Sequence, residues 1–367
     1  MAREAGFEAH VIDLFGDQDT RFAARTTTAL TPNRYFDFNA GELLGAIAGQ
    51  QCLNGPMPIV CGSAFERAPA PLAAMARHYR VLGCEAEVYR RLLDLPALFE
   101  TLRREEGIDT PITSWQAPTR PGDWLRKRIG GSGGDHIEQA QAARCASREY
   151  YFQKRAWGAS RSALFIANGR ECRYYGCAEH LRWHGSASFR YEGARRLLNV
   201  PASLRAGLER IGAILTARLA LRGCFGIDFL WREDARLTLL DINPRPTATL
   251  ELWPERHRMF SAHLAACTEE TLLYSSPQAD TQRAHLILYA DAPWRVADGL
   301  AWPAWIADQP RAGTPMPRGA PLCTLQGEGA TPAALEDNLL QRYRSLRTLI
   351  GEHAQAVLPA SLSIRIM

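Results

Sequence analysis

The sequence contains almost no lysine. Of its 43 basic residues only Lys127 and Lys154 are lysines, and all the others are arginines. A general preference for arginine accounts for the imbalance, and it draws attention to the two lysines that remain. Because the planar guanidinium is bulkier than the compact ammonium, a retained lysine is a candidate for a position that arginine cannot fill.

Other absences exclude whole classes of protein. The net charge is only +4 and no basic run is interleaved with aromatic residues, so no nucleic-acid partner is expected. The nine cysteines are scattered without C-x-x-C spacing, which indicates neither a zinc site nor a disulfide framework and fits a cytoplasmic protein. There is no apolar run of about 18 residues and no apolar core of a signal peptide, so no membrane association is expected.

The chain is long enough for several units. We expect an N-terminal α/β domain over residues 1–92, a small lobe over 93–157, a large lobe over 158–270 and a C-terminal module over 271–367. The first alternates strand and helix, which favours a small parallel sheet of the Rossmann-like type. Its strands are expected at 8–15, 34–38 and 57–61 and its helices at 40–51 and 71–79. A strand should precede residue 8 in such a domain, so the sheet lacks its first strand or the start of the sequence is truncated or misassigned.

A glycine-rich loop follows a strand near the middle of the chain. Residues 124–129 predict a strand that carries Lys127, and the next five residues are Gly130, Gly131, Ser132, Gly133 and Gly134. Such a loop can wrap its backbone N–H groups around anionic oxygens, with the lysine as a point charge beside it. It is not a Walker loop, because no G-K-[ST] ends it. A plain flexible linker is the alternative interpretation.

Residues 149–192 predict antiparallel strands followed by a polar loop. Residues 149–157 read as a strand with Gln153, Lys154 and Arg155, and Asn168-Gly169 is a strong hairpin signal. Residues 175–192 look like a loop, and three of its side chains are candidates for binding substrate: Arg190, Tyr191 and Glu192.

A second hairpin, over residues 226–245, brings two carboxylates together. If Arg232 pairs with Leu237 across the turn, Asp228 lies opposite Asp241, and Asn243 points to the same face. Like charges placed in this way repel each other, whereas a hard cation such as Mg²⁺ or Mn²⁺ takes oxygen ligands. An ordinary hairpin with a polar outer face is the alternative, and a slip of one residue in register would scatter the ligands.

The C-terminal module shows no catalytic constellation. Short strands are expected at 285–289, 304–307 and 320–325. A final helix should begin with Thr331 as its cap and Pro332 at its first position, and end near residue 353.

The order of these parts resembles the ATP-grasp superfamily over roughly residues 60–260. The resemblance implies that Lys127 contacts the phosphates of ATP and that Gly130–Gly134 fold over them. The strand with Gln153, Lys154 and Arg155 matches the hinge beside adenine. The metal set maps onto Asp228, Asp241 and Asn243, and Arg245 of the N-P-R run faces the transferred phosphate or the substrate carboxylate.

The chain departs from the family pattern at three points. The second metal-binding acid is usually glutamate and is Asp241 here. The hinge usually carries glutamate after glutamine and here has Lys154. An earlier lysine that is typical of the family is absent, and only Arg90 and Arg91 stand near its place.

The resemblance implies an α/β (α+β) ATP-grasp fold and an ATP-dependent carboxylate–amine ligase that uses Mg²⁺ or Mn²⁺ and forms an acyl phosphate. Its partners are a small carboxylic acid and an amine, and the resemblance allows a homodimer. The GSAFE run after residue 61 and the terminal module look like a subgroup from methylotrophs and methanogens. This subgroup includes ligases that join glutamate to tyramine or tyrosine in methanofuran or methylofuran biosynthesis. A non-catalytic or regulatory nucleotide-binding protein and a carboxylase-like enzyme are the alternatives.

Overall fold

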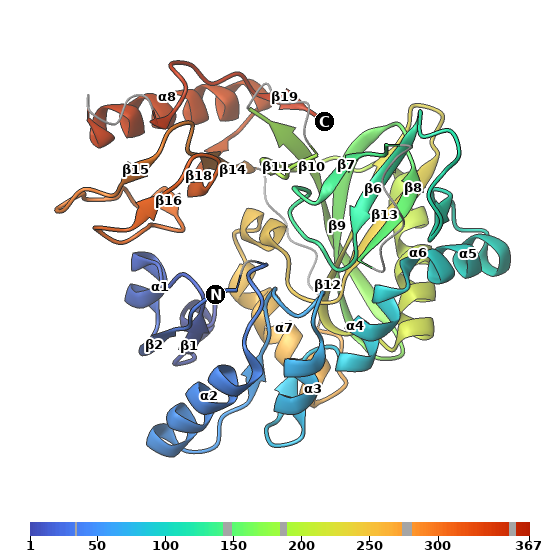
Figure 1. Cartoon of the computed structure of the whole chain (residues 1–367), viewed down its shortest axis with the longest axis horizontal. Helices are drawn as coiled ribbons and strands as arrows, with labels where there is room; N and C mark the ends of the chain where they lie inside the picture. Colours follow the sequence, from blue (N-terminus) through green and yellow to red (C-terminus); the bar gives the residue numbers. More distant parts are fainter. Residues whose placement is uncertain (34, 142–148, 184–188, 274–280, 352–356) are drawn as a thin grey trace.

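The computed structural model describes residues 1–33, 35–141, 149–183, 189–273, 281–351 and 357–367. Its framework is a 9-stranded sheet in the order β13-β12-β9-β10-β11-β14-β18-β16, with β19 paired to β10. Figure 1 shows this sheet running from the large lobe into the C-terminal part of the chain. The central strands are β9 (Ala159–Asn168), β10 (Cys172–Arg182), β11 (Gly193–Arg196), β12 (Arg222–Trp231) and β13 (Leu237–Asn243).

Each face of the central strands packs against a different helix. On β9, Ala163, Phe165 and Ala167 belong to one core with helix α6 (Ala202–Leu219). Leu164 and Ile166 belong to another core with helix α7 (Arg256–Thr268). Because successive side chains of a strand point to opposite faces, this division follows from the apolar sequence of β9 itself. The 3₁₀ helix η2 (Ala248–Leu252) leads from β13 into α7 on the second face.

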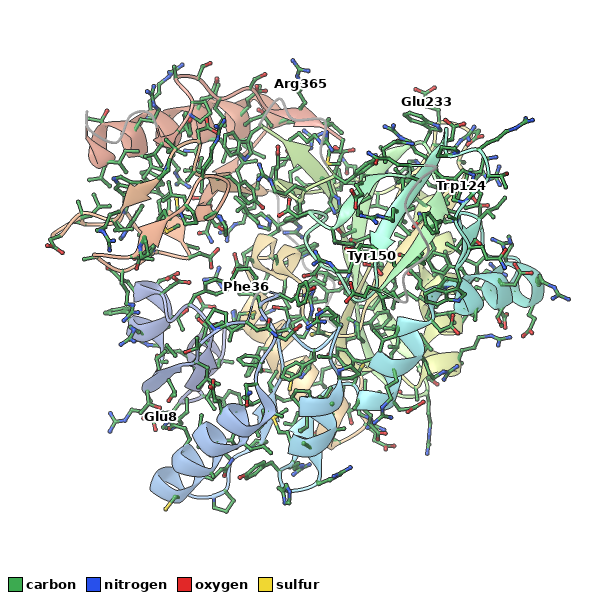
Figure 2. The ribbon with its side chains drawn as sticks, viewed as in Figure 1. Glu8, Phe36, Trp124, Tyr150, Glu233 and Arg365 are labelled. Carbon is green, nitrogen blue, oxygen red and sulfur yellow. The ribbon has the colours of Figure 1, made fainter. Side chains whose placement is uncertain are left out.

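A separate 4-stranded sheet in the order β5-β8-β6-β7 forms the small lobe. Its strands are β5 (Thr113–Ser114), β6 (Trp124–Arg128), β7 (Ile137–Gln139) and β8 (Tyr150–Lys154). In Figure 2, Trp124 lies towards the rim of the molecule and Tyr150 near its middle. Since Arg128 pairs with Tyr150, the glycine-rich loop after β6 starts at the inner end of this sheet.

The N-terminal part contains two separate pairs of parallel strands. β1 (His10–Asp13) pairs with β2 (Thr26–Ala29), and β3 (Ile59–Val60) pairs with β4 (Val81–Leu82). The other elements are η1 (Arg3–Ala5), α1 (Gln18–Ala23), α2 (Ala40–Asn54), α3 (Ala70–Ala76), α4 (Ala86–Leu93) and α5 (Leu95–Glu106). The predicted helices at 40–51 and 71–79 are confirmed, whereas residues 35–38 form no strand and residue 34 lies outside the described part.

The C-terminal part continues the large sheet. Its strands are β14 (Gln282–Tyr289), β15 (Trp294–Arg295), β16 (Ile306–Ala307), β17 (Pro315–Met316), β18 (Pro321–Gly329) and β19 (Arg365–Ile366). Helix α8 (Pro332–Ile350) begins as predicted, because the Thr331 side chain accepts a hydrogen bond from Ala334 N. α8 packs on β18 and β14 through a core that includes Leu286, Leu325 and Leu339. Across the described ranges, no helix combines the length and the apolar content needed to cross a membrane.

Two further local predictions were wrong. Residues 175–182 form the second half of strand β10 instead of a loop, because they pair with β9 and β11 and residues 177–181 are all buried. In the β12–β13 hairpin, Leu237 pairs with Trp231 and not with Arg232. A bulge between Phe229 and Asp228 absorbs one residue of β13, so Asp228 still pairs with Asp241 as expected.

Candidate active site

Lys127 is a buried cation at the inner end of β6. Only 7% of it is exposed, and its Nζ donates a hydrogen bond to Gln153 Oε1 at 3.0 Å. Burial lowers the pKa of Lys127, and the charges of Asp241 and Asp228 oppose that shift. Lysine and both carboxylates are therefore neighbours in space, although 101 residues separate Lys127 from Asp228 in the sequence. A buried ammonium whose hydrogen-bond partner is a neutral amide can accept an anionic ligand at low cost.

The glycine-rich loop is packed tightly enough to require glycine at particular points. A Cβ on Gly130 would lie 2.4 Å from Arg67 Cα, and one on Gly134 would lie 2.0 Å from Phe189 O. Both residues also have positive φ, which side chains rarely adopt. Tyr191 N donates to Gly133 O at 2.7 Å, so the segment 189–191 is docked on the loop. The loop thus lies between the N-terminal part and the large lobe.

The β12–β13 hairpin brings the candidate metal ligands together. Asp228 and Asp241 form a directly opposed pair, and Asn243 Nδ2 donates to Asp228 Oδ2 at 3.2 Å. The turn of this hairpin, marked by Glu233 in Figure 2, lies at the rim of the molecule, and the Asp228–Asp241 pair lies further along the two strands, away from the turn. Ligands from two strands therefore converge where the small lobe places Lys127.

The electrostatics at this pair suit a divalent cation. Burial raises the pKa of Asp241 to about 6; Lys127 opposes this shift, and the charge of Asp228 adds to it. Two carboxylates and an amide form an oxygen-donor set of the kind that Mg²⁺ takes. Among the described residues, no group of three or more His, Cys, Asp or Glu side chains could hold a metal, so this mixed set depends on the amide and on oxygens of a bound ligand.

Arg245 is held by a residue from the N-terminal part of the chain. Its Nε forms an ion pair with Glu66 Oε1, and its Nη1 donates to Pro246 O at 3.1 Å. Its Nη2 lies 3.4 Å from Asn243 Oδ1. Glu66 belongs to the GSAFE run, which follows β3. The structure places this loop beside the candidate metal ligands.

The three residues predicted to bind substrate have different surroundings. The Arg190 guanidinium lies 3.6 Å from the centroid of the Tyr289 ring, and its Nη2 is 3.9 Å from Glu192 Oε1. Glu192 is 1% exposed and accepts a hydrogen bond from Trp183 N at 3.0 Å, which ties the residue before β11 to the residue after β10. The hydroxyl of Tyr191 lies 2.7 Å from His285 Nε2, so this side chain bonds to strand β14.

The three residues of the expected adenine hinge have different surroundings at the end of β8. Gln153 is buried and faces Lys127, whereas Lys154 is exposed. The Arg155 guanidinium stacks 4.1 Å from the ring centroid of Trp157. Of the two lysines of the chain, only Lys127 therefore faces the candidate site.

The cavity at this site is small. It has a volume of about 50 Å³ and is lined by Lys127, Gly130, Gly131, Ser132, Asp241 and Asn243 among others. The His136 ring fills the space next to Gly131, and burial together with the charge of Lys127 lowers the pKa of His136 to about 4. Ligand pockets usually have volumes of about 300–1,000 Å³. The glycine-rich loop and His136 therefore occupy part of the space beside Lys127.

Three further side chains surround the site: His180, His285 and Tyr289. His180 is buried on β10, with its Nε2 3.8 Å from Asp228 Oδ1 and its Nδ1 2.9 Å from Ser160 Oγ. His285 and Tyr289 come from β14, in the part of the chain where no constellation was expected. A partial signal was present in β14, because 283, 285 and 289 are polar and lie on one face, although Ile287 interrupts the alternation.

Sequence comparison identifies one domain. Residues 96–249 match the family described as the ATP-grasp domain. This segment contains the glycine-rich loop, the β8 strand and the β12–β13 hairpin. A search of curated protein sequences gave no match.

Solved structures resemble nearly the whole chain in fold. The biotin carboxylase domain of 2-oxoglutarate carboxylase from Hydrogenobacter thermophilus, in complex with MgADP, ADP and bicarbonate, has a TM-score of 0.68 at 12% identity. That match covers 99% of this chain and 87% of the domain. N5-carboxyaminoimidazole synthetase from Staphylococcus aureus, complexed with ADP, has a TM-score of 0.62 at 15% identity, covering 95% and 92%. Pyruvate carboxylase from Rhizobium etli has a TM-score of 0.66 at 11% identity over 97% of this chain, which spans only 36% of that protein.

These identities are low enough that the structural likeness concerns the fold alone. The fold and the matched segment agree with each other and with the geometry around Lys127 and the two aspartates. The chain adopts the mixed α/β ATP-grasp fold, and its residues 96–249 form an ATP-grasp domain.

Proposed function

We propose that this protein is an ATP-dependent carboxylate–amine ligase. One observation carries the proposal: a buried lysine, a closely packed glycine-rich loop and an Asp–Asp–Asn set from separate strands converge on one site. Phosphoryl transfer needs positioning and charge neutralisation more than covalent help from the protein, and these residue types supply both.

In the first step the substrate carboxylate attacks the γ-phosphorus of ATP. The bond between the β,γ-bridging oxygen and the γ-phosphorus breaks, so the products are an acyl phosphate and ADP. Lys127 and the N–H groups of Gly130–Gly134 bind the phosphate oxygens. Arg245 stabilises the transferred phosphate or the acid, because Glu66 holds its Nε and fixes the direction of the guanidinium.

In the second step the amine attacks the acyl carbon. The bond between that carbon and the phosphate oxygen breaks, phosphate leaves and an amide remains. Asp228, Asp241 and Asn243 are the residues that would hold Mg²⁺ or Mn²⁺. When bound, the ion neutralises charge on the phosphate oxygens.

The substrate pair is a further part of the proposal. The sequence resembles ligases that join glutamate to tyramine or tyrosine, and Arg190 and Tyr191 border the docked loop where a substrate would approach. Glutamate with tyrosine or tyramine is therefore the pair to assay first. A homodimer is also part of this proposal, and sedimentation of the purified chain tests it.

The test is ADP release by the whole protein across a panel of acids and amines. In Asp241→Asn, loss of one carboxylate should reduce the rate at least 100-fold, about 2.7 kcal/mol in the barrier, with an unchanged circular dichroism spectrum. Glu233→Gln is the matched control, because Glu233 lies exposed in the turn of the same hairpin. Turnover by Asp241→Asn at the wild-type rate would rule out the metal assignment.

The same assay separates the alternatives. ADP release that requires bicarbonate and no amine would indicate a carboxylase-like reaction, as in the biotin carboxylase domain with which the chain shares its fold. Binding of ATP with no release of ADP under any combination would indicate a non-catalytic nucleotide-binding protein.

A further inference from the structure

A second cavity, with a volume of about 260 Å³, lies outside the nucleotide site. We call it the β14–β18 cavity. Its walls come from the η2 region and from the C-terminal part of the chain, and the residues that matter below are Glu251, Arg256, Arg283, Trp305, Glu328 and Arg342. None of these residues stood out in the sequence.

The sheet register connects this cavity to the candidate metal site. His180 pairs with Ala194, Ala194 pairs with His285, and His285 pairs with Gln326, across β10, β11, β14 and β18. Directly opposed residues share a face, and neighbouring strands lie about 4.8 Å apart. His180, beside Asp228, and His285, on the cavity wall, are therefore about 10 Å apart on one face.

Tyr191 lies between the two sites. Its hydroxyl bonds to His285 Nε2, and its ring meets the His180 ring edge-on with centroids 5.2 Å apart. Burial raises the pKa of Tyr191 well above its ordinary value, and the charges of both Asp228 and Glu251 add to that shift. Tyr191 therefore feels the charge of Asp228 at the candidate metal site and the charge of Glu251 on the cavity wall.

The charges of the cavity suit a ligand with one anionic and one cationic group. Two of its arginines have carboxylate partners: Arg256 with Glu4, and Arg283 with Glu328 at 3.4 Å. Arg342 Nη1 donates only to the carbonyl of Gln326, at 2.8 Å, and within the described ranges Arg342 has no ion-pair partner.

Two further features of the walls point to a missing ligand. Arg283 Nε is buried without a hydrogen-bond partner in the described structure, and so is Nδ1 of His285, a residue that is only 2% exposed. Glu251 accepts a hydrogen bond from the neutral Gln326 side chain. Buried polar groups usually have partners, so the unpartnered nitrogens indicate that the polar walls are completed by a bound molecule.

We propose that the β14–β18 cavity binds the amine substrate, and that this substrate is an amino acid. Its carboxylate binds Arg342 beside Arg283, and its ammonium group binds Glu251, which directs the nitrogen towards Tyr191 and the acyl phosphate. Trp305 supplies an aromatic wall for the side chain. This inference rests on the proposed ligase reaction and names the class of its second substrate.

Glu251 also serves as the acceptor for the first proton that the amine must lose. The ammonium group transfers one proton to the Glu251 carboxylate, and the neutral amine attacks the acyl carbon. The second proton leaves with phosphate when the bond between carbon and phosphate oxygen breaks. Burial raises the pKa of Glu251 to about 7; Asp308 and Asp19 add to the shift, and Arg256 and the Gln326 hydrogen bond oppose it. A base with a pKa near the working pH is efficient in proton transfer.

Tyrosine and tyramine provide a matched pair of probes, because they differ only by the carboxylate. With glutamate as the acid, Arg342→Gln should raise the KM for tyrosine at least 10-fold and leave the KM values for tyramine and ATP unchanged. Arg344→Gln is the control, since Arg344 is exposed on the same helix. Equal KM values for tyrosine in Arg342→Gln and in the wild type would overturn the proposal, as would an equal loss for tyrosine and tyramine.

Direct binding separates this inference from the proposed function. Calorimetry with a non-hydrolysable ATP analogue present measures the binding of tyrosine without any turnover. If no acid and amine support ADP release, the ligase fails, and Arg342-dependent binding of tyrosine would still establish the cavity as an amino-acid site. If ADP is released with amines but tyrosine binds Arg342→Gln and wild type equally, the ligase stands and the cavity assignment fails.

Glu251→Gln tests the proton acceptor. In the wild type, kcat/KM for the amine should rise with pH through about 7 as Glu251 ionises. Glu251→Gln should lose that rise and reduce kcat at least 10-fold, with the KM for ATP unchanged. A variant that keeps the wild-type pH profile would show that Glu251 has no part in proton transfer.

Discussion

At the scale of single residues, Lys127 is the position where the composition of the chain and its structure agree most closely. A sequence that uses arginine almost everywhere keeps a lysine where the side chain is 7% exposed and bonded to Gln153. The cavity beside it has a volume of only about 50 Å³. A guanidinium needs more space than an ammonium group and presents a planar fork of donors, so this site selects the smaller cation.

Lys127→Arg should therefore weaken nucleotide binding although the charge is kept. Overpacking a buried site typically costs about 1–3 kcal/mol, which corresponds to roughly a 5-fold to 150-fold rise in the Kd for ATP. The measurement is calorimetry with ATP. Lys154→Arg is the internal control, because the only other lysine of the chain is exposed at the end of β8. If the two variants bind ATP equally well, the retained lysine reflects chance.

At the scale of elements, the pairing of Asp228 with Asp241 was predictable and its cause was not. Counting from an assumed Arg232–Leu237 pair gave the correct carboxylates, but the hairpin starts one residue out of that register and a bulge restores it. Bulges depend on local packing on both faces of a sheet, and no pattern in the turn sequence specifies one. The prediction was therefore right at the site and wrong at the turn.

Two neighbouring glycines of the glycine-rich loop allow a test of its contact with the segment 189–191. Gly133 and Gly134 both have positive φ, so alanine at either position pays a conformational cost of about 1 kcal/mol. A Cβ meets no atom within 4 Å at Gly133, whereas at Gly134 it would meet Phe189 O. Gly134→Ala should separate the segment 189–191 from the loop and lower kcat/KM for ATP at least 10-fold relative to Gly133→Ala. Equal values in the two variants would show that this docking has no role in catalysis.

At the scale of the whole molecule, short-range patterns predicted most strands and the family resemblance implied the ATP-grasp fold, but neither predicted the joining of distant segments. The β11–β14 pairing carries the large sheet into the C-terminal part of the chain, and so brings His285 and Tyr289 to Tyr191. Such contacts depend on which edges of the sheet are free. A strand sequence specifies which of its faces is buried and leaves open which partner it meets.

The N-terminal and C-terminal parts of the chain also meet directly, through acidic residues. The Asp19 carboxylate accepts hydrogen bonds from Asp308 N and Gln309 N at 3.0 and 3.1 Å. Burial raises the pKa of the nearby Asp17 to about 7; Asp308, Asp13 and Asp19 add to the shift, and Arg311 opposes it. This contact should therefore weaken when Asp17 becomes charged.

The sign of the pH effect follows from the two pKa values of Asp17. The folded value of about 7 lies above the ordinary value of 3.8, so the folded state favours the protonated acid. The stabilisation that protonated Asp17 gives the folded state is complete below pH 3.8. It is lost as the pH rises from 3.8 through the folded pKa of about 7. Because Asp17 is partly exposed, solvent screening reduces the effect to about 1–2 kcal/mol.

Asp17→Asn should abolish this loss between pH 6 and pH 8. The side chain makes no capping hydrogen bond to α1, so asparagine removes the charge without removing a bond. In thermal unfolding scans the wild-type Tm should fall by about 1–3 °C over that interval relative to the variant. Asp298→Asn is the control, because Asp298 is exposed in the C-terminal part. Parallel Tm–pH curves for the wild type and Asp17→Asn would show that Asp17 does not govern the contact between the two ends of the chain.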